Sequence, residues 1–385
     1  MKIAILSEKY TPDIGGLAIS SERLARLLTS AGHHVRVFAP TLSLAASETR
    51  SLRSNGIGVT RFGAHKRVDD TLVHWFELLV EEHKHEPFDV LHAYFLTQAG
   101  FSAAYAGNYL GVPSVVSARG NDLERAFFDP SRAAHILYSL QHASAVTTNA
   151  KELAKKAKAL IPRLDVTVIP NGIDSDHFKP LPRNNALRDS LNLINGGQVA
   201  ELTRVIGFAG ELREKKGLRQ LLSAYAQVNK LNPAALLIVG DVRAAEDRQF
   251  FDEFKLANPE TRIVITGFVS PDELPSYYAL MDVFVHPSLR DGLPNALLEA
   301  MACEKAVIAS PVGGIVDAIT DCENGKLIPV NDVGGLANGI EELLSDNHLR
   351  KNFGSAARQT TLNIFTPQAE LNANLDVYRR LGIKR

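Results

Sequence analysis

The sequence predicts an α/β protein built from two doubly wound units, and three observations point to this fold class. Short apolar runs alternate with longer amphipathic runs along the whole chain, which is typical of parallel strands joined by crossover helices. At 385 residues the chain is too long for one ordinary core, so two domains are expected. A polar, proline-bearing stretch at 180–201 separates the runs into two series and is expected to be a linker or a surface excursion.

The first series predicts one doubly wound unit. Its expected strands are short apolar runs: 2–6, 35–39, 59–62, 90–93, 114–117, 145–148 and 166–169. Amphipathic stretches that fall between most of these runs are expected to be helices: 20–31, 71–83, 98–110, 133–141 and 150–161.

The second series repeats the same pattern. Its expected strands are 205–209, 235–239, 262–266, 283–285, 306–309 and 326–328. Helical patterns are expected at 296–302, 334–344, 349–361 and 367–381.

Composition excludes several classes of protein. Hydrophobic residues make up 45% and charged residues 22% of the chain, as in a globular enzyme, and a net charge of −1 gives no global attraction to nucleic acid or to an acidic membrane. The two cysteines, Cys303 and Cys322, exclude a disulfide framework and a zinc cluster. The sequence shows no signal-peptide pattern and no apolar run near the roughly 20 residues of a membrane span, so a cytoplasmic location is expected.

Residues 288–302 carry the strongest functional signal. Two carboxylates, Asp291 and Glu299, lie eight positions apart, between an incoming apolar strand and an outgoing Ala/Leu-rich helix. A turn that feeds a helix presents backbone N–H groups suited to phosphate, and carboxylates suit sugar hydroxyls. This pairing indicates a nucleotide-sugar site, whose expected turn residues are Gly292, Leu293, Pro294 and Asn295.

This segment resembles the E-x7-E region of the family-4 retaining glycosyltransferases, with Asp291 where the family usually has its first Glu. The resemblance implies the GT-B fold, in which two Rossmann-like domains face each other across a cleft and the last helix returns to the N-terminal domain. The implied boundaries are an acceptor domain at 1–175 with the returning helix at 366–385, a linker at 176–202, and a donor domain at 203–365.

Two further motifs of the second half match the family. In the Gly210–Gly217 loop, Lys216 stands at the family's phosphate-binding lysine, while Glu211 replaces a common arginine and Arg213 is the nearest candidate to substitute for it. The resemblance places the nucleotide base at Gly267 and Phe268, where a strand ends in glycine and an aromatic residue.

The first half matches more loosely. Gly15 and Gly16, between the first strand and the first helix, match the loop that faces the donor diphosphate. His92 matches the first His of a His-x-His motif in which Tyr94 replaces the second, although a strand-end His is more often structural.

The strand-end sequence Arg119-Gly-Asn-Asp122 is also expected on the acceptor side. Many family members have His where Arg119 stands. Because arginine is not deprotonated in proteins, Arg119 is expected to bind or orient substrate and not to act as a base.

The resemblance implies a retaining, metal-independent glycosyltransferase that uses a nucleoside-diphosphate sugar, UDP- or GDP-linked, as co-substrate and needs no cofactor. Lys216, Asp291 and Arg119 are the expected catalytic residues. The acceptor is a hydroxyl on a glycan, a lipid-linked sugar or a small molecule, with weak peripheral membrane contact if it is a lipid. No metal site is expected, since the histidines lack ligand-like spacing.

Three alternatives remain open. An epimerase or phosphorylase could share the fold, and a non-catalytic protein could bind sugar nucleotides. A nicotinamide oxidoreductase would need the sequence Gly-x-Gly-x-x-Gly after a strand, and neither the Gly15–Gly16 loop nor the Gly210–Gly217 loop has this sequence.

Overall fold

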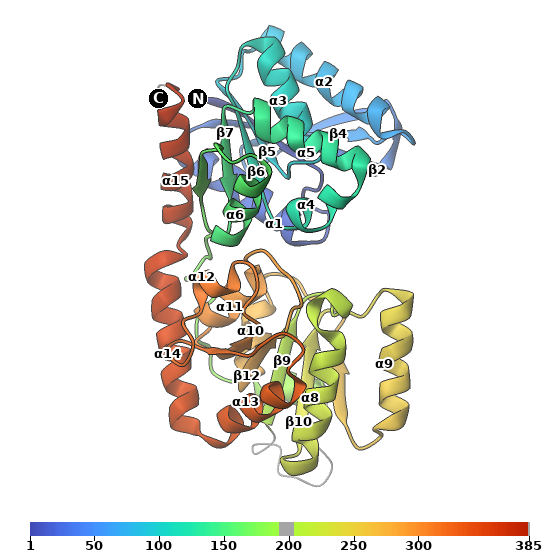
Figure 1. Cartoon of the computed structure of the whole chain (residues 1–385), viewed down its shortest axis with the longest axis vertical. Coiled ribbons are helices and arrows are strands. Elements are labelled where there is room, and N and C mark those ends of the chain that lie inside the picture. The colour runs from blue at the N-terminus through green and yellow to red at the C-terminus, as the bar shows by residue number, and fades with distance from the viewer. Residues whose placement is uncertain (192–203, 384–385) are drawn as a thin grey trace. The chain divides into compact units, whose positions relative to one another are not determined.

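The computed structural model describes residues 1–191 and 204–383, which form two compact units. Unit 1 comprises Met1–Gly172 and the C-terminal segment from Pro367, and unit 2 comprises Ile173–Thr366. Each unit is a largely parallel sheet with helices on both faces (Figure 1). The predicted α/β class with two Rossmann-like units is confirmed.

The sheet of unit 1 has the order β3-β4-β2-β1-β5-β6-β7-β8 and is parallel except for the pair β3 and β4. Its strands are β1 (Lys2–Ser7), β2 (His34–Ala46), β3 (Thr49–Ser54), β4 (Ile57–Gly63), β5 (Val90–Tyr94), β6 (Ser114–Ala118), β7 (Ala145–Thr148) and β8 (Val166–Val168). From β1 the chain adds β2, β3 and β4 on one side of β1, and then adds β5 to β8 on the opposite side. The strand order therefore reverses at β1. Ligands of open α/β sheets bind above such a reversal.

Side chains that alternate along the strands of unit 1 build a core on each face of the sheet. Ile3 and Ile5 of β1 pack with α1 and the C-terminal helix, and Ala4 and Leu6 pack on the opposite face with helices that follow later in the chain. The helices are α1 (Gly16–Ser30), α2 (Val68–His85), α3 (Gln98–Leu110), α4 (Asn121–Glu124), α5 (Pro130–His142), α6 (Lys151–Leu160) and α15 (Pro367–Arg380), with a 3-10 turn, η1, at Ala126–Phe128.

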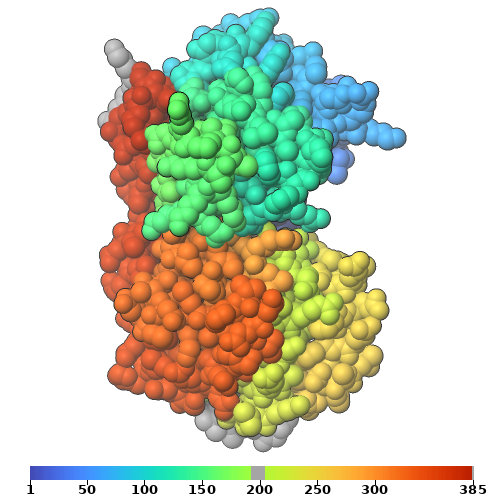
Figure 2. Space-filling view, viewed as in Figure 1, coloured from blue at the N-terminus to red at the C-terminus, as the bar shows by residue number. Residues whose placement is uncertain are grey.

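The C-terminal helix α15 returns to unit 1, as the family resemblance implied (Figures 1 and 2, red). Arg23 of α1 holds Glu370 of α15 with two hydrogen bonds, of 2.6 and 3.2 Å. The Gly172 amide donates to the same carboxylate at 2.9 Å. A bidentate, nearly buried pair of this kind fixes the helix on the sheet.

The sheet of unit 2 has the order β11-β10-β9-β12-β13-β14, and all of its pairs are parallel. Its strands are β9 (Arg204–Ala209), β10 (Ala234–Val239), β11 (Arg262–Ile265), β12 (Val283–His286), β13 (Ala306–Ala309) and β14 (Lys326–Leu327). The order reverses between β9 and β12, which is the place where a ligand is expected.

Two apolar cores cover the faces of this second sheet. One core contains side chains of α8 and α13, and the other contains side chains of α10, α11, α12 and α14. The helices are α7 (Asn185–Ser190), α8 (Leu218–Leu231), α9 (Ala245–Ala257), α10 (Leu274–Leu280), α11 (Asn295–Ala302), α12 (Ile315–Ala318), α13 (Val333–Ser345) and α14 (Asn347–Ile364), with a 3-10 turn, η3, at Glu214–Lys216.

Two features differ from the sequence-based expectations. The strand expected at 35–39 continues to Ala46. On the far side of its neighbour β4 lies β3, a strand that was not expected because all residues of β3 are exposed and show no apolar alternation. The expected linker contains α7, capped by the Asn184 side chain at 3.0 Å from the Leu187 amide. Residues 192–202 of that linker, and residue 203 after it, lie outside the described part of the chain.

Candidate active site

The expected phosphate-binding residues meet where the strand order of unit 2 reverses. Loop 210–217 follows β9, loop 287–294 follows β12, and these two strands are neighbours. The Leu289 amide donates to the Lys215 carbonyl at 3.0 Å and ties the loops together. Lys216 and Asp291 thus lie at the carboxyl ends of the strands, in the position where open α/β sheets bind ligands.

Two glycines allow the loops to pack this closely. Gly217 has a φ of +80°, and a Cβ there would lie 2.1 Å from the Pro287 carbonyl oxygen. Gly313, after β13, has a φ of +56°, and its Cβ would lie 1.7 Å from the carbonyl oxygen of Asp291. Any other residue at either position would push the backbone of the Asp291 loop away.

Lys216 and Asp291 form an ion pair at the centre of the site. The Lys216 ammonium contacts Oδ2 of Asp291, and the side chains are only 21% and 13% exposed. Burial raises the pKa of Asp291, but the Lys216 charge and the hydrogen bond from His286 outweigh this and hold the pKa well below its usual value. Asp291 is therefore an ionised acceptor that holds the lysine in place.

Sequence reasoning missed two residues that contact Asp291. Nε2 of His286, at the end of β12, lies 3.0 Å from Asp291 Oδ2, and the Ser288 hydroxyl lies 3.0 Å from Nε2 and 3.4 Å from Oδ2. The other oxygen, Oδ1, accepts from the Gly292 amide at 3.1 Å. The signal that could have found His286 is a polar side chain that closes an otherwise apolar, buried strand.

Glu299 is buried on α11, in the same unit. The Tyr278 hydroxyl donates to Glu299 Oε2 at 2.7 Å and lies 3.3 Å from the Ala296 carbonyl oxygen. Burial raises the pKa of Tyr278 well above its usual value, and the nearby carboxylate raises it further. The tyrosine therefore remains a proton donor that orients Glu299.

The other expected donor residues are less enclosed. The Arg213 guanidinium lies 3.7 Å from the Glu211 carboxylate, and both side chains are well exposed. The structure thus pairs Glu211, which stands where the family commonly has arginine, with Arg213, the candidate to replace that arginine. Gly267 follows β11 with a φ of +71° and donates to the Gly240 carbonyl at 2.9 Å. The neighbouring Phe268 is 65% exposed and offers an aromatic face at this edge.

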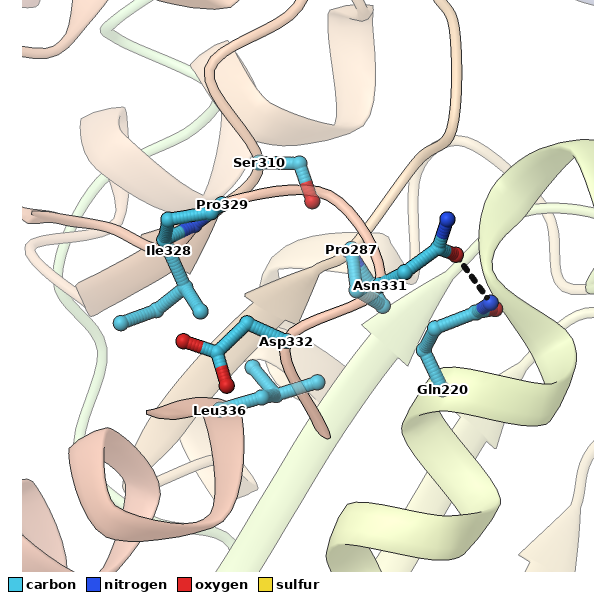
Figure 3. Close-up of a pocket in the computed structure, with 8 residues that line it drawn as sticks. All are labelled: Gln220, Pro287, Ser310, Ile328, Pro329, Asn331, Asp332 and Leu336. Carbon is cyan, nitrogen blue, oxygen red and sulfur yellow. Dashed lines mark hydrogen bonds between the residues drawn. The ribbon is translucent and has the colours of Figure 1, made fainter. Parts of the chain in front are cut away.

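A small hollow adjoins the site at the carboxyl ends of β12, β13 and β14 (Figure 3). The Gln220 side chain donates to Asn331 Oδ1 at 2.8 Å across it. It is lined by Gln220, Pro287, Ser310, Ile328, Pro329, Asn331, Asp332 and Leu336. The hollow borders the Asp291 loop through Pro287 but contains neither Lys216 nor Asp291.

In unit 1, Gly15 and Gly16 lie at the start of α1, with Gly15 at a φ of +131°. The loop that leads to them is fixed by Arg61 of β4, whose Nη2 lies 3.0 and 2.9 Å from the two carboxylate oxygens of Asp13. Arg61 Nη1 also donates to the Tyr10 carbonyl at 3.1 Å. These contacts tie the segment that precedes the two glycines to β4.

His92 is fully enclosed in unit 1. Its Nδ1 lies 2.6 Å from the Tyr378 hydroxyl of α15 and its Nε2 lies 2.8 Å from the Ser117 hydroxyl of β6. Burial lowers the pKa of His92 to about 3, helped by the Arg119 charge. Both ring nitrogens are used within the protein, so the geometry favours the structural role over contact with an acceptor.

Replacing His92 with glutamine should reduce the acid sensitivity of the fold. A histidine with a folded pKa near 3 binds fewer protons than in the unfolded chain, so its contribution to stability is lost as pH falls below about 6.5. Between pH 7 and pH 5 this amounts to about 2 kcal/mol, at roughly 1.4 kcal/mol per pH unit. Urea unfolding of parent and His92→Gln at both pH values measures the difference. The exposed His85, replaced by glutamine, serves as control; equal pH dependence in parent and His92→Gln would contradict the burial argument.

Arg119 lies directly after β6, and Asp122 lies in the short helix α4 that follows. Arg119 Nη2 donates to Asn171 Oδ1 at 2.6 Å, and its guanidinium lies 4.6 Å from the centre of the Tyr94 ring. The buried Asp122 carboxylate accepts from the amides of Leu96, Arg119, Gly120 and Leu123 at 3.0–3.3 Å. Burial raises the pKa of Asp122 to about 6, and these amides oppose the rise. Because its carboxylate binds four backbone amides, Asp122 shapes the segment that carries Arg119.

Within residues 1–191 and 204–383, no group of three or more His, Cys, Asp or Glu side chains is arranged to hold a metal ion. In the same ranges, no helix is long and apolar enough to cross a membrane.

Two family models match this chain. The model described as Glycosyltransferase Family 4 matches residues 14–177, and the model described as Glycosyl transferases group 1 matches residues 193–360. The first lies almost wholly in unit 1, and the second lies within unit 2. Both halves of the chain are therefore recognised by models of the same kind of protein.

Known proteins align along nearly the whole chain. An N-acetyl-alpha-D-glucosaminyl L-malate synthase from Bacillus anthracis is 24% identical over 98% of this chain and 97% of its own. A GDP-mannose-dependent alpha-mannosyltransferase from Mycobacterium tuberculosis is 27% identical over 94% of this chain and 92% of its own. The structure of Anabaena HepE in complex with UDP-glucose superposes with a TM-score of 0.81 and 21% identity, covering 99% of this chain and 100% of that one, which is a similarity of fold.

Proposed function

Because the chain belongs to the family-4 glycosyltransferases of the GT-B fold, we propose that it transfers a sugar from a nucleoside-diphosphate sugar to a hydroxyl acceptor with retention of configuration. The observation that carries this proposal is the Lys216–Asp291 pair at the strand-order reversal of unit 2. One member of the pair suits a phosphate, and the other suits the sugar joined to it.

Lys216 serves the departing diphosphate. An ammonium group has three N–H donors, so Lys216 can keep Asp291 and still donate to a phosphate oxygen. Charge grows on the diphosphate as the glycosidic bond breaks, and a cation fixed in advance stabilises that charge without reorganisation. Partial burial of the pair strengthens the interaction, because the local dielectric is lower than in water.

Asp291 serves the donor sugar. Its Oδ2 already accepts from Lys216 and His286, whereas Oδ1 accepts from the backbone of Gly292 at 3.1 Å. Oδ1 is therefore the oxygen through which the carboxylate would accept from sugar hydroxyls. Such charge-assisted hydrogen bonds orient the sugar relative to the leaving group.

The nucleoside part extends from this pair across the sheet. Glu299, oriented by Tyr278, is proposed to accept from the ribose hydroxyls. The base is proposed to lie at Gly267 and Phe268, after β11, which is two strands from β9. Neighbouring strands are about 4.8 Å apart, so the span is roughly 10 Å, comparable to the length of a nucleoside diphosphate.

The acceptor is proposed to bind the predicted acceptor domain, residues 1–175 with the returning helix 366–385, and the donor is proposed to bind residues 203–365. Arg119 binds or orients a substrate group there, since its guanidinium stays protonated. Retention without a side-chain base follows if a diphosphate oxygen takes the acceptor proton as the sugar leaves. The Gly15–Gly16 loop, whose preceding segment is tied to β4 through Arg61 and Asp13, is proposed to be a substrate-binding loop of unit 1.

The names of two similar proteins support a choice of the first nucleotides to test. One relative is named for GDP-mannose, and the Anabaena structure holds UDP-glucose. Both donors share the diphosphate that Lys216 would hold and differ in the base that Gly267 and Phe268 would meet. UDP- and GDP-sugars are therefore the first donors to test, with sugars, polyols and hydroxy acids as acceptors.

Phosphorus and proton NMR of such mixtures tests the proposal. The expected result is acceptor-dependent conversion of one nucleotide sugar to its nucleoside diphosphate, with the anomeric configuration of the sugar unchanged in the product. Inversion of the anomeric centre would contradict the retaining mechanism. Binding of a nucleotide sugar without transfer to any acceptor would favour a non-catalytic sugar-nucleotide binding protein.

Transfer should persist in excess EDTA. Lys216 supplies positive charge at the diphosphate position, so the leaving group does not depend on a divalent ion. We expect the rate of nucleoside-diphosphate release to stay within about twofold of the untreated rate. Complete loss, restored by manganese or magnesium, would show that a metal ion carries the charge that we assign to Lys216.

A further inference from the structure

His286 is a polar side chain in an apolar setting next to the proposed site. It is the last residue of β12 and is 1% exposed. Its ring lies near the rings of Phe208 and Phe284, with centroids 6.0 and 6.2 Å away and nearly parallel planes. Burying an imidazole among aromatic rings is costly unless its polar atoms are used.

The contacts of His286 define its tautomer. Nε2 lies 3.0 Å from Asp291 Oδ2, and a carboxylate can only accept, so Nε2 carries the proton. Nδ1 is buried and has no hydrogen-bond partner among the described residues. An N–H at Nδ1 would therefore be unsatisfied, which again favours the proton on Nε2.

The surroundings keep this ring neutral. Burial lowers the pKa of His286, the Lys216 ammonium lowers it further, and the Asp291 carboxylate only partly opposes them. A second proton would have to sit on Nδ1, which is buried and has no hydrogen-bond partner among the described residues. His286 is thus a fixed, neutral N–H donor and is not suited to act as a general acid.

We propose that His286, supported by Ser288, is a positioning residue that fixes the Asp291 carboxylate for the reaction, an inference that rests on the proposed glycosyl transfer. His286 and Lys216 hold Oδ2, and the backbone of Gly292 reaches Oδ1. Donors at both oxygens fix the plane of the carboxylate. That plane directs Oδ1 toward the donor sugar and keeps the ammonium of Lys216 in place for the diphosphate.

Two substitutions at this position separate positioning from packing. Glutamine can place an N–H near the position of Nε2, whereas leucine keeps apolar bulk and has no donor. We expect His286→Leu to lower kcat with the nucleotide sugar by about 10- to 100-fold, as for one lost hydrogen bond to a charged group. His286→Gln should recover most of that loss, and affinity for the free nucleoside diphosphate should change less than threefold in both variants.

A pH profile gives a second readout. Loss of the His286 hydrogen bond raises the pKa of Asp291, so the acid limb of kcat/KM should move to higher pH in His286→Leu and return in His286→Gln. Ser288→Ala should shift the profile in the same direction by a smaller amount. If His286→Leu folds and matches the parent in kcat and in pH profile, the positioning role is wrong.

Nitrogen-15 NMR tests the inference without activity. The His286 signals, assigned by their loss in His286→Gln, should show a neutral ring protonated on Nε2 at pH 8. A charged ring or the Nδ1–H tautomer would overturn the inference even if His286→Leu failed to fold. If the parent binds no nucleoside diphosphate and transfers no sugar, the proposed function fails, and the NMR result still decides the state of His286.

Discussion

Lys216→Ala is expected to lower the turnover of the nucleotide sugar by about 100- to 1,000-fold, the usual effect of removing one preorganised group that stabilises developing charge. The loss should fall mainly on kcat, because negative charge on the diphosphate is greatest in the transition state. Affinity for the nucleoside without phosphates should stay within about threefold of the parent. Steady-state kinetics and nucleoside titrations measure the two effects.

Two neighbouring cations provide controls for this variant. Lys215→Ala removes an adjacent charge but keeps the backbone carbonyl that accepts from Leu289, so its turnover should remain near that of the parent. Arg213→Ala breaks the contact with Glu211 and tests whether Arg213 shares the phosphate. Parent-like turnover in Lys216→Ala, with a large loss in Arg213→Ala, would transfer the leaving-group role to Arg213.

Glu299→Ala is expected to weaken the binding of the nucleoside diphosphate by about 100-fold. Ribose hydroxyls that donate to a carboxylate form hydrogen bonds worth about 1.5–3 kcal/mol each. Tyr278→Phe keeps the carboxylate but removes the hydroxyl that orients it, so a smaller loss of about three- to tenfold is expected.

The exposed Glu323, replaced by alanine, is the surface control for both variants and should bind as the parent does. Calorimetric titration gives the dissociation constants, and thermal unfolding shows whether each variant is folded. Unchanged affinity in a folded Glu299→Ala protein would remove Glu299 from the nucleotide site.

The strands of both sheets could be predicted because their signal is local. A buried parallel strand needs a short apolar run, and β1 or β10 shows this run in the sequence alone. β3 gave no such signal, since its exposed side chains bury nothing and its place depends on pairing with β4. The helix α7 was not predicted because it lies in a polar stretch without apolar periodicity, where only an Asn cap marks its start.

Candidate site residues could be predicted from the sequence when they lie within a loop motif. They could not be predicted when their role depends on contact with a side chain that is distant in the sequence. Lys216 and Asp291 could be named as candidates because glycine turns, helix starts and family motifs surround them in the sequence. The contact of His286 with Asp291 depends on the way that the intervening loop folds back, which no periodicity specifies. The contact of His92 with Tyr378 depends on the return of α15.

The central claim is that unit 2 binds a nucleoside diphosphate at the ends of β9 and β12, and calorimetric titration tests it most directly. The parent protein, Lys216→Ala and Glu299→Ala would each be titrated with UDP, GDP and ADP in excess EDTA. We expect one of these nucleotides to bind the parent with a stoichiometry of about one, and to bind both variants more weakly. If none of the three nucleotides binds the parent, or if one binds all three proteins equally, Lys216 and Glu299 do not form a nucleotide site.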